Sequence, residues 1–255
     1  MCVLIFLKAQ GMYEQMKKCI IVGIILIATK TNALAHPFKL TYIQVDSQTI
    51  QQESGSSLTK SEVKKALFEA IKQGDLKQVQ KFIRSGINPN TPGDHNLLPL
   101  MAAISFNQRK IFEYLISAGA DVNAEDVYGS RPIQAAAKDD RLFYLDILIK
   151  RGAKVNVDTI TGATPLIFAA SYGHINAIRH LLQHGADVNM INTIEETALM
   201  RAVLGNHADI VKLLLSHHAK TDVKDRDGKT ALDLAREKNY TSIIQLLEKA
   251  NKTKL

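Results

Sequence analysis

Histidine is the residue type in this chain that could bind a metal or transfer a proton near neutral pH. Eight histidines occur, and His180 and His184 stand four residues apart, a spacing that places two imidazoles on one face of a helix. A zinc site needs further ligands, but no glutamate follows His180 to form the H-E-x-x-H motif. The adjacent residues His217 and His218 suit the end of a helix better than a metal site. The sequence therefore predicts no metal site and no cofactor.

Nucleophilic catalysis also lacks the motifs that usually carry it. The chain contains no G-x-S-x-G segment and no glycine-rich loop of the phosphate-binding type. We therefore expect a protein that is not an enzyme, and we expect its function to lie on a surface.

A 33-residue period runs through most of the chain. Three residue types recur, each in its own phase: Gly86, Gly119, Gly152 and Gly185; Pro99, Pro132 and Pro165; Asn90, Asn123, Asn156 and Asn189. A period of this length is typical of a solenoid, in which each repeat is one small unit that buries its apolar face against its neighbours.

The unit from 157 to 189 shows why such a segment folds as two helices. Thr164 can cap a helix with its hydroxyl group, and Pro165 suits the first helical position because no N–H is needed there. Apolar residues between Ile175 and Leu182 recur at spacings of three and four, which predicts a second amphipathic helix. Gly185 can then end that helix in the left-handed conformation.

The motifs of this unit, T-P-L-x-x-A-A, G-H and G-A-D-V-N, resemble those of the ankyrin repeat family. The resemblance implies an all-α fold, an ankyrin-repeat solenoid of stacked helix-turn-helix units joined by β-turn or hairpin loops. It divides the chain into an N-terminal capping unit and five repeats, followed by a short tail. Their expected bounds are 59–90, then about 91–123, 124–156, 157–189, 190–222 and 223–250, with the tail at 251–255.

Some positions depart from the family pattern. The histidine of the family's T-P-L-H turn, which ties adjacent repeats together, is replaced in the five repeats by Met101, Gln134, Ile167, Met200 and Asp233. We therefore expect that tie to be missing. In the fifth unit, 190–222, His218 replaces the capping glycine and Glu195 the turn glycine, so we expect the fifth and sixth units to open first.

The first 35 residues resemble a secretory signal peptide. Met16-Lys17-Lys18 precedes an apolar run of 11 residues, 19–29, and Ala33-Leu34-Ala35 provides a small-residue cleavage site. A membrane anchor is the alternative, but a spanning helix needs roughly 20 apolar residues. Met12 and Met16 are alternative translation starts. Residues 36–58 are expected to form a flexible N-terminal segment.

The basic charge of the chain does not indicate a nucleic-acid partner. Removal of the leader takes away four lysines and one glutamate, which lowers the formal net charge from +7 to +4. Lysine and arginine in 60–84 account for that remaining excess, and a basic helix is usually a solvated face. We expect a monomer without a membrane span after processing.

The family resemblance implies where partners would be held, namely at the turn tips and at the exposed face of the first helix of each repeat. Several residues at those positions are apolar or aromatic, which favours a protein interface. The predicted partner-binding residues are His95, Phe106, Tyr128, Lys138, Ile160, Tyr172, Ile194, Leu204 and Arg226.

These observations predict an exported, non-catalytic scaffold for protein–protein interaction, located in a periplasm or secreted. Two alternatives remain open at this point. One is a periplasmic protein that stabilises a single envelope enzyme, and the other is a secreted effector that binds host proteins. The partner itself is one or more proteins that the sequence does not name.

Overall fold

The computed structural model describes residues 59–252, and the expected leader and N-terminal segment lie outside that range. Within it the chain forms twelve α-helices in six antiparallel pairs, with one 3-10 helix, η1 (Asp94–Asn96). The first helices of the pairs are α4 (Lys60–Gln73), α6 (Pro99–Ser105), α8 (Pro132–Lys138), α10 (Pro165–Tyr172), α12 (Ala198–Leu204) and α14 (Ala231–Glu237). The second helices are α5 (Leu76–Arg84), α7 (Arg109–Ser117), α9 (Leu142–Lys150), α11 (Ile175–Gln183), α13 (Ala208–Ser216) and α15 (Thr241–Lys252).

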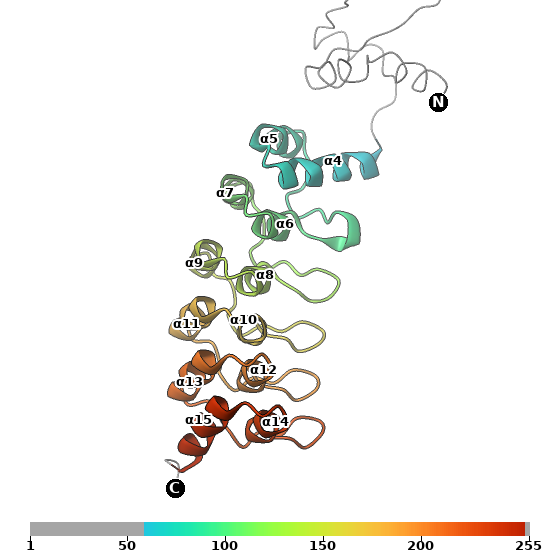
Figure 1. Ribbon diagram of the computed structural model, residues 1–255. Helices are drawn as coiled ribbons and strands as arrows, with labels where there is room; N and C mark the ends of the chain where they lie inside the picture. Colours follow the sequence, from blue (N-terminus) through green and yellow to red (C-terminus); the bar gives the residue numbers. More distant parts are fainter. Residues whose placement is uncertain (1–58, 253–255) are drawn as a thin grey trace, which may run out of the picture. The chain divides into compact units, whose positions relative to one another are not determined.

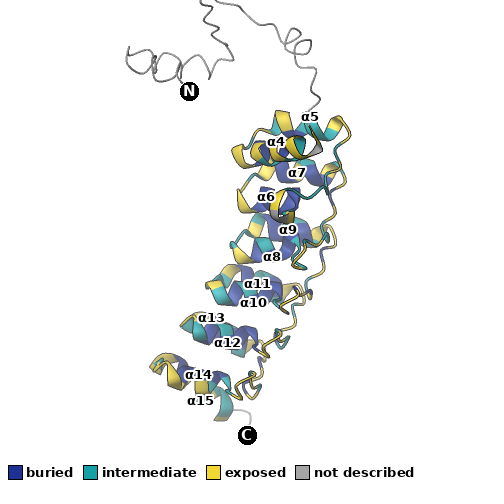
Figure 2. Ribbon diagram, turned by 90° about the vertical axis from the view of Figure 1, so that its right-hand side faces the viewer, coloured by how far each residue is buried: buried dark blue, intermediate teal, exposed yellow. Residues whose placement is uncertain are grey.

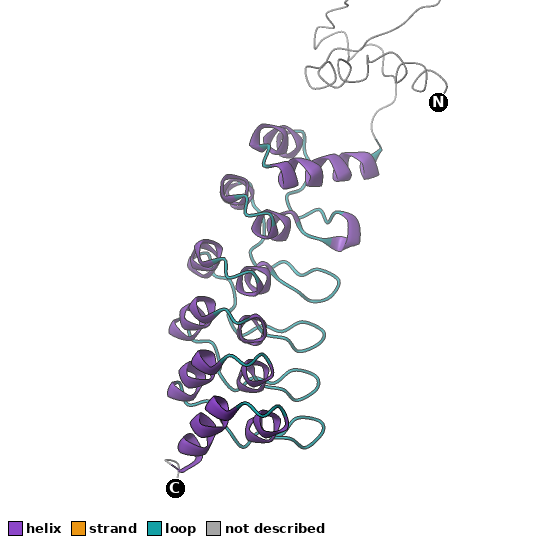
Figure 3. Cartoon of the chain, viewed as in Figure 1, coloured by secondary structure: helices purple, strands orange, loops and turns teal. Residues whose placement is uncertain are grey.

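The helix pairs stack in one row, so the all-α solenoid expected from the period is confirmed (Figure 1). Each first helix packs against the first helices of the neighbouring units, from α4 against α6 to α12 against α14. Second helices form a parallel layer, with α9 against α11 and α11 against α13. Loops project from the ends of the first helices on the side away from the second helices (Figure 3).

Local sequence explains where the helices begin and end. The hydroxyl group of Thr164 accepts a hydrogen bond from the Ile167 N–H at 3.1 Å, and Pro165 is the first residue of α10, as predicted. Thr197 and Thr230 cap α12 and α14 in the same way. Gly185 has a φ of +82° in the turn after α11, which confirms the predicted left-handed position.

The core follows the stack as a continuous layer of apolar side chains. The ribbon is dark blue at buried residues in Figure 2. Small residues such as Ala169 and Ala170 are fully buried, which lets the first helices approach closely. Between the second helices, the Phe112 and Tyr144 rings meet edge to face with their centroids 4.8 Å apart. Burial of this apolar surface is the main force that holds the stack together.

The periodic asparagines are hydrogen-bonded ties between units. The side-chain oxygen of Asn156 accepts from the Asp187 N–H at 2.8 Å, and its amide group donates to the Gly185 carbonyl at 2.9 Å. Asn123 and Asn90 make the same two bonds one and two units earlier, respectively, and Asn189 accepts from the Lys220 N–H. Each tie holds the loop that follows one second helix against the loop that follows the next second helix, 29 to 31 residues further along the chain.

The expectation that the inter-repeat tie of the T-P-L-H turn is missing throughout is wrong at one position. The amide of Gln134 donates to the Ala163 carbonyl at 2.9 Å, and its oxygen accepts from the Arg131 N–H at 2.7 Å. Because glutamine carries both a donor and an acceptor, it can join its own turn to the next unit. Asp233 instead turns back to cap its own helix at Thr230.

The irregular positions of the fifth unit adopt the backbone conformation that glycine normally takes. Among residues 59–252, seven non-glycine residues have a positive φ, and five of them are asparagine or aspartate. Those two residue types tolerate the left-handed region best. The exceptions are Glu195 at +63° and His218 at +62°, which are the two substitutions singled out in the sequence.

No helix in the described part of the chain is both long enough and apolar enough to cross a bilayer.

Candidate protein-binding surface

Five similar loops, here called fingers, precede the first helices of units two to six. They comprise residues 93–97, 126–130, 159–163, 192–196 and 225–229. In the second finger, the Asp126 carboxylate accepts hydrogen bonds from the Tyr128 N–H at 2.9 Å and the Ser130 N–H at 2.8 Å. Thr159, Asn192 and Asp225 accept from the equivalent backbone groups in the next three fingers. One polar side chain therefore fixes the shape of each of these four loops.

Backbone hydrogen bonds also join one finger to the next. The Ile160 N–H donates to the Tyr128 carbonyl at 3.0 Å, and the Arg226 N–H donates to the Ile194 carbonyl at 3.2 Å. Between these two bonds, the Thr193 N–H donates to the Thr161 carbonyl at 3.0 Å. The tips from 126 to 228 thus form a connected row with side chains at defined spacings.

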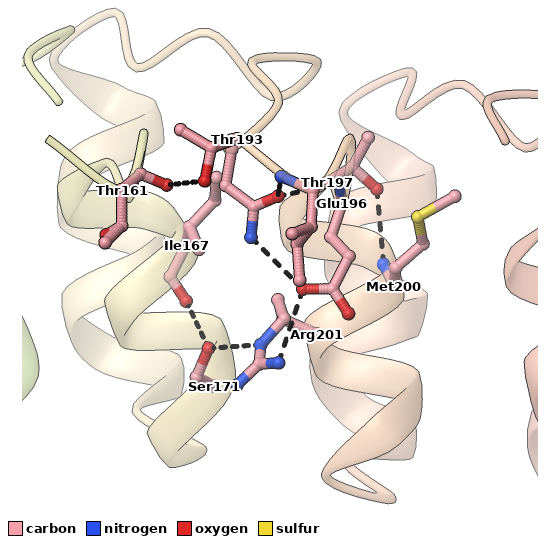
Figure 4. A network of polar contacts seen from close by, with 10 residues as sticks. Thr161, Ile167, Ser171, Thr193, Glu196, Thr197, Met200 and Arg201 are labelled. Atoms are coloured by element: carbon pink, nitrogen blue, oxygen red, sulfur yellow. Dashed lines mark hydrogen bonds and ion pairs between the residues drawn. The ribbon is translucent and has the colours of Figure 1, made fainter. Parts of the chain in front are cut away.

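A buried polar network supports the fourth finger on the helices behind it (Figure 4). The Glu196 carboxylate, only 7% exposed, accepts from Arg201 at 3.3 Å and from the Asn192 amide at 3.1 Å. Arg201 also donates to the Ser171 hydroxyl group at 3.0 Å, which lies on α10 of the preceding unit. The charge of Glu196 is thereby compensated, and the finger is held to two neighbouring first helices.

Exposed apolar side chains gather on the side of the molecule formed by the fingers and the first helices, here called the finger face. Eight large apolar residues in the described range are exposed, and only Leu142 lies on a second helix. The other seven lie on the finger face: Phe106, Val127, Tyr128, Ile160, Tyr172, Ile191 and Ile194. Ile160 is the most exposed of them, at 68%. Such a one-sided distribution is the usual mark of an interface.

The predicted partner-binding residues occupy different parts of this face. Phe106 directly follows α6, and Tyr172 is the last residue of α10. The Lys138 ammonium group, at the end of α8, lies 5.6 Å from the centre of the Tyr172 ring, and that ring also stacks with His174. These contacts bring residues from two neighbouring units together in one cluster.

The remaining predicted residues are placed less uniformly. Arg226 is exposed, and its guanidinium group donates to the Thr193 carbonyl at 2.7 Å. Leu204 is half-buried and packs against the core at the end of α12. His95 lies in η1, and its side chain is outside the described part of the structure.

Two exposed apolar residues, Val127 and Ile191, were absent from the predicted set. Val127 lies at the tip of its finger directly before Tyr128. Ile191 precedes its finger at a position where the second unit carries Pro92 and the other units carry Glu125, Asp158 or Lys224. An exposed isoleucine at a position that is charged in three of the other four units was the available signal.

The histidine pair, His180 on α11 and His184 directly after it, lies among the second helices, away from the fingers. The rings of His180 and His184 are 4.5 Å apart, and Nε2 of His180 is buried without a hydrogen-bond partner. Burial lowers the pKa of His180, the charge of His184 lowers it further, and the Asp146 carboxylate opposes both effects. No group of three or more metal-binding side chains occurs among residues 59–252.

The geometry defines a class of protein, namely a helical repeat solenoid with a row of loops along one side. The family comparisons agree with that class. A family model described as "Ankyrin repeats (3 copies)" matches residues 44–126 and 124–192, and a second, "Ankyrin repeats (many copies)", matches residues 181–235. The chain belongs to the ankyrin repeat family. A search of the curated proteins finds no match to it.

Proposed function

We propose that this protein is an exported, non-catalytic scaffold that binds a partner protein on its finger face. Ankyrin repeats serve as scaffolds for protein–protein interaction, and the repeats are shown here. The observation that carries the proposal is that, of the eight large apolar side chains exposed within residues 59–252, seven lie on one face.

The fold itself does not require these side chains to be apolar. A substitution at an exposed site usually changes stability little, so solvation alone would favour polar residues at the tips. Tyr128 and Tyr172 supply large rigid rings, a kind of side chain that is enriched among the residues that dominate binding energy at protein interfaces. Tyr128 lies in a finger held by the hydrogen bonds described above, and Tyr172 lies on the helix α10, so little order has to be gained on binding.

Affinity capture tests the proposed interaction. The bait is the full chain with a C-terminal tag, in wild-type or variant form, expressed in cells of the source organism. Tyr128→Ala combined with Tyr172→Ala is expected to reduce capture of a specific partner at least tenfold, with a nearly unchanged melting curve. Leu142→Ala is the matched control, because it removes an exposed apolar side chain from the opposite side. Equal capture by all three proteins would contradict the proposal.

The export part of the proposal is supported by the leader pattern in residues 16–35 and is tested separately. Fractionation of cells that carry the tagged chain is expected to place it in the periplasm or the medium, with an N-terminus at His36. Recovery of a chain in the cytosol that retains residues 16–35 would contradict export without affecting the interaction.

A further inference from the structure

The three middle repeats, residues 125–223, carry opposite charge on their two sides. On the finger side, segments 125–140, 158–173 and 191–206 contain seven acidic and three basic side chains, a formal net charge of −4. The second helices and the loops that follow them, in 141–157, 174–190 and 207–223, contain seven basic and four acidic side chains, a net charge of +3. The side that displays the apolar residues is therefore also the acidic side.

The three positive charges of the finger side are already engaged within the protein. Arg131 forms an ion pair with Glu125, and Arg201 forms one with Glu196. Lys138 lies over the ring of Tyr172. These contacts leave the acidic excess of the face uncompensated.

Three carboxylates on the same side have neither a hydrogen bond nor an ion pair to any residue in 59–252. Asp158 and Glu195 are exposed beside the apolar residues Ile160 and Ile194, and Asp139 is half-exposed at the end of α8. A cationic group placed next to them would gain electrostatic energy without breaking an existing contact.

An open groove at the second finger adds a shape that suits a long cationic side chain. It has a volume of about 290 Å³, and its walls include Pro92, Leu98 and Val127 together with Glu125 and Asp126. Lysine and arginine pack an aliphatic stem against apolar surface and keep the charged group beside polar atoms. The groove offers both kinds of surface within one recess.

We infer that the partner segment held on the finger face combines apolar side chains with lysine or arginine. This inference rests on the proposed function and specifies the chemistry of the partner. Residues 36–58, the segment before the repeats that remains once the leader is removed as proposed, are a poorer match, because they carry Lys39 against Asp46 and Glu53. The occupant is accordingly a basic, apolar segment of another protein.

Selection from a phage-displayed library of random 12-residue peptides, with the purified full chain immobilised through a C-terminal tag, tests this inference. Selected peptides are expected to be rich in lysine or arginine next to apolar residues and poor in acidic residues. The triple variant Asp139→Asn, Asp158→Asn, Glu195→Gln is expected to weaken binding of the leading peptide about tenfold.

A second triple variant, Glu113→Gln, Asp209→Asn, Asp222→Asn, is the matched control. It changes the net charge by the same amount at exposed positions on the second-helix side, so binding is expected to stay within twofold of the wild type. Equal weakening by both triple variants would show a general charge effect and overturn the inference.

The outcomes separate the inference from the proposed function. The selected peptides could lack basic residues and still lose binding to the double variant Tyr128→Ala/Tyr172→Ala. That result would overturn the inference and leave the proposed function intact. Failure to select any peptide, or binding that is unaffected by the tyrosine substitutions, would count against both. The wild-type protein could also form a dimer by itself while the variant Asp139→Asn, Asp158→Asn, Glu195→Gln is a monomer. That result would place a second copy of the chain on the face, which also overturns the inference.

Discussion

The two sides of this solenoid are built from the same repeats but differ in what their surfaces carry. Of the eight large apolar side chains exposed in the described repeats, seven lie on the finger face, which has an acidic excess, and one lies on the second-helix side, which has a basic excess. Packing requires only the residues between these surfaces, most of which are fully buried. The difference shows that the fold fixes the positions of the surface side chains without determining their chemistry, which is where a specific partner can be selected.

The largest effect is expected from a truncation in the core shared by both sides. Leu145→Ala removes a fully buried side chain from α9 and is expected to lower the free energy of unfolding by about 2–5 kcal/mol. Leu142→Ala, on the same helix but 39% exposed, is expected to cost about 0.5 kcal/mol or less. Denaturant titration measures both values. Similar losses at the two positions would show that Leu142 belongs to the packed layer and would weaken the contrast between the sides.

A smaller effect is expected at the asparagine ties, which couple neighbouring units. Asn156→Ala removes the bonds to the Asp187 N–H and the Gly185 carbonyl, and should cost about 2 kcal/mol. Asn156→Asp keeps an acceptor for the Asp187 N–H and loses the donor, so about half of that cost is expected. Thermal or denaturant unfolding of the two variants provides the comparison. An unchanged stability of Asn156→Ala would mean that water replaces both bonds without loss.

The irregular fifth unit allows a reciprocal exchange at equivalent positions. Gly185→His places a side chain in a left-handed position with open space around it, so the expected cost of about 1–2 kcal/mol is purely conformational. His218→Gly should stabilise the protein by about 0.5–1 kcal/mol, less than the reverse cost because glycine loses more backbone entropy. Hydrogen exchange is the direct measurement, with slower exchange expected from Leu199 to Leu247 in His218→Gly. Uniform protection of the wild type across the stack would contradict the expectation that this end opens first.

The smallest effect is expected from the titration of His180 on the second-helix side. Its pKa is lowered in the folded protein, chiefly by burial, so the unfolded chain binds more protons as the pH falls below about 6.5. Stability should therefore decrease from pH 7.5 to pH 5.5. The decrease should be smaller in His180→Gln, which cannot be protonated. The control His217→Gln changes a ring at an exposed helix end and should keep the pH dependence of the wild type. An equal pH dependence of the wild type and His180→Gln would exclude His180 as the cause.

Much of the fold followed from local physics that the sequence displays directly. The hydroxyl group of Thr164, the ring of Pro165 and the left-handed Gly185 act within their own unit, so residue type and spacing were sufficient to predict them. Ties between units were harder to predict, because they depend on how neighbouring units meet in space. Gln134 was expected to lack a partner in the next unit but bonds to Ala163, and the role of the periodic asparagines became visible only once the units were stacked.

The binding surface was predictable to the extent that the repeat period fixes which positions face outward. Five of the six apolar residues predicted there are exposed, while Leu204 turns partly toward the core at the end of α12. Ile191 was missed because it precedes the finger, at a position that the family pattern does not assign to the turn. The uneven charge of the two sides was also not seen in the sequence. The segments that form the two sides alternate along the chain, so their acidic and basic residues separate only after folding.

Site-specific photo-crosslinking in living cells tests most directly whether the finger face is the side that holds the partner. A photoreactive phenylalanine analogue replaces Ile160, the most exposed large apolar residue of the finger face, or Leu142, an exposed apolar residue on a second helix. We predict a discrete cross-linked adduct with the analogue at position 160 and none at position 142. An adduct at position 142 alone, or equal adducts at both positions, would contradict the assignment of the finger face as the partner-binding surface.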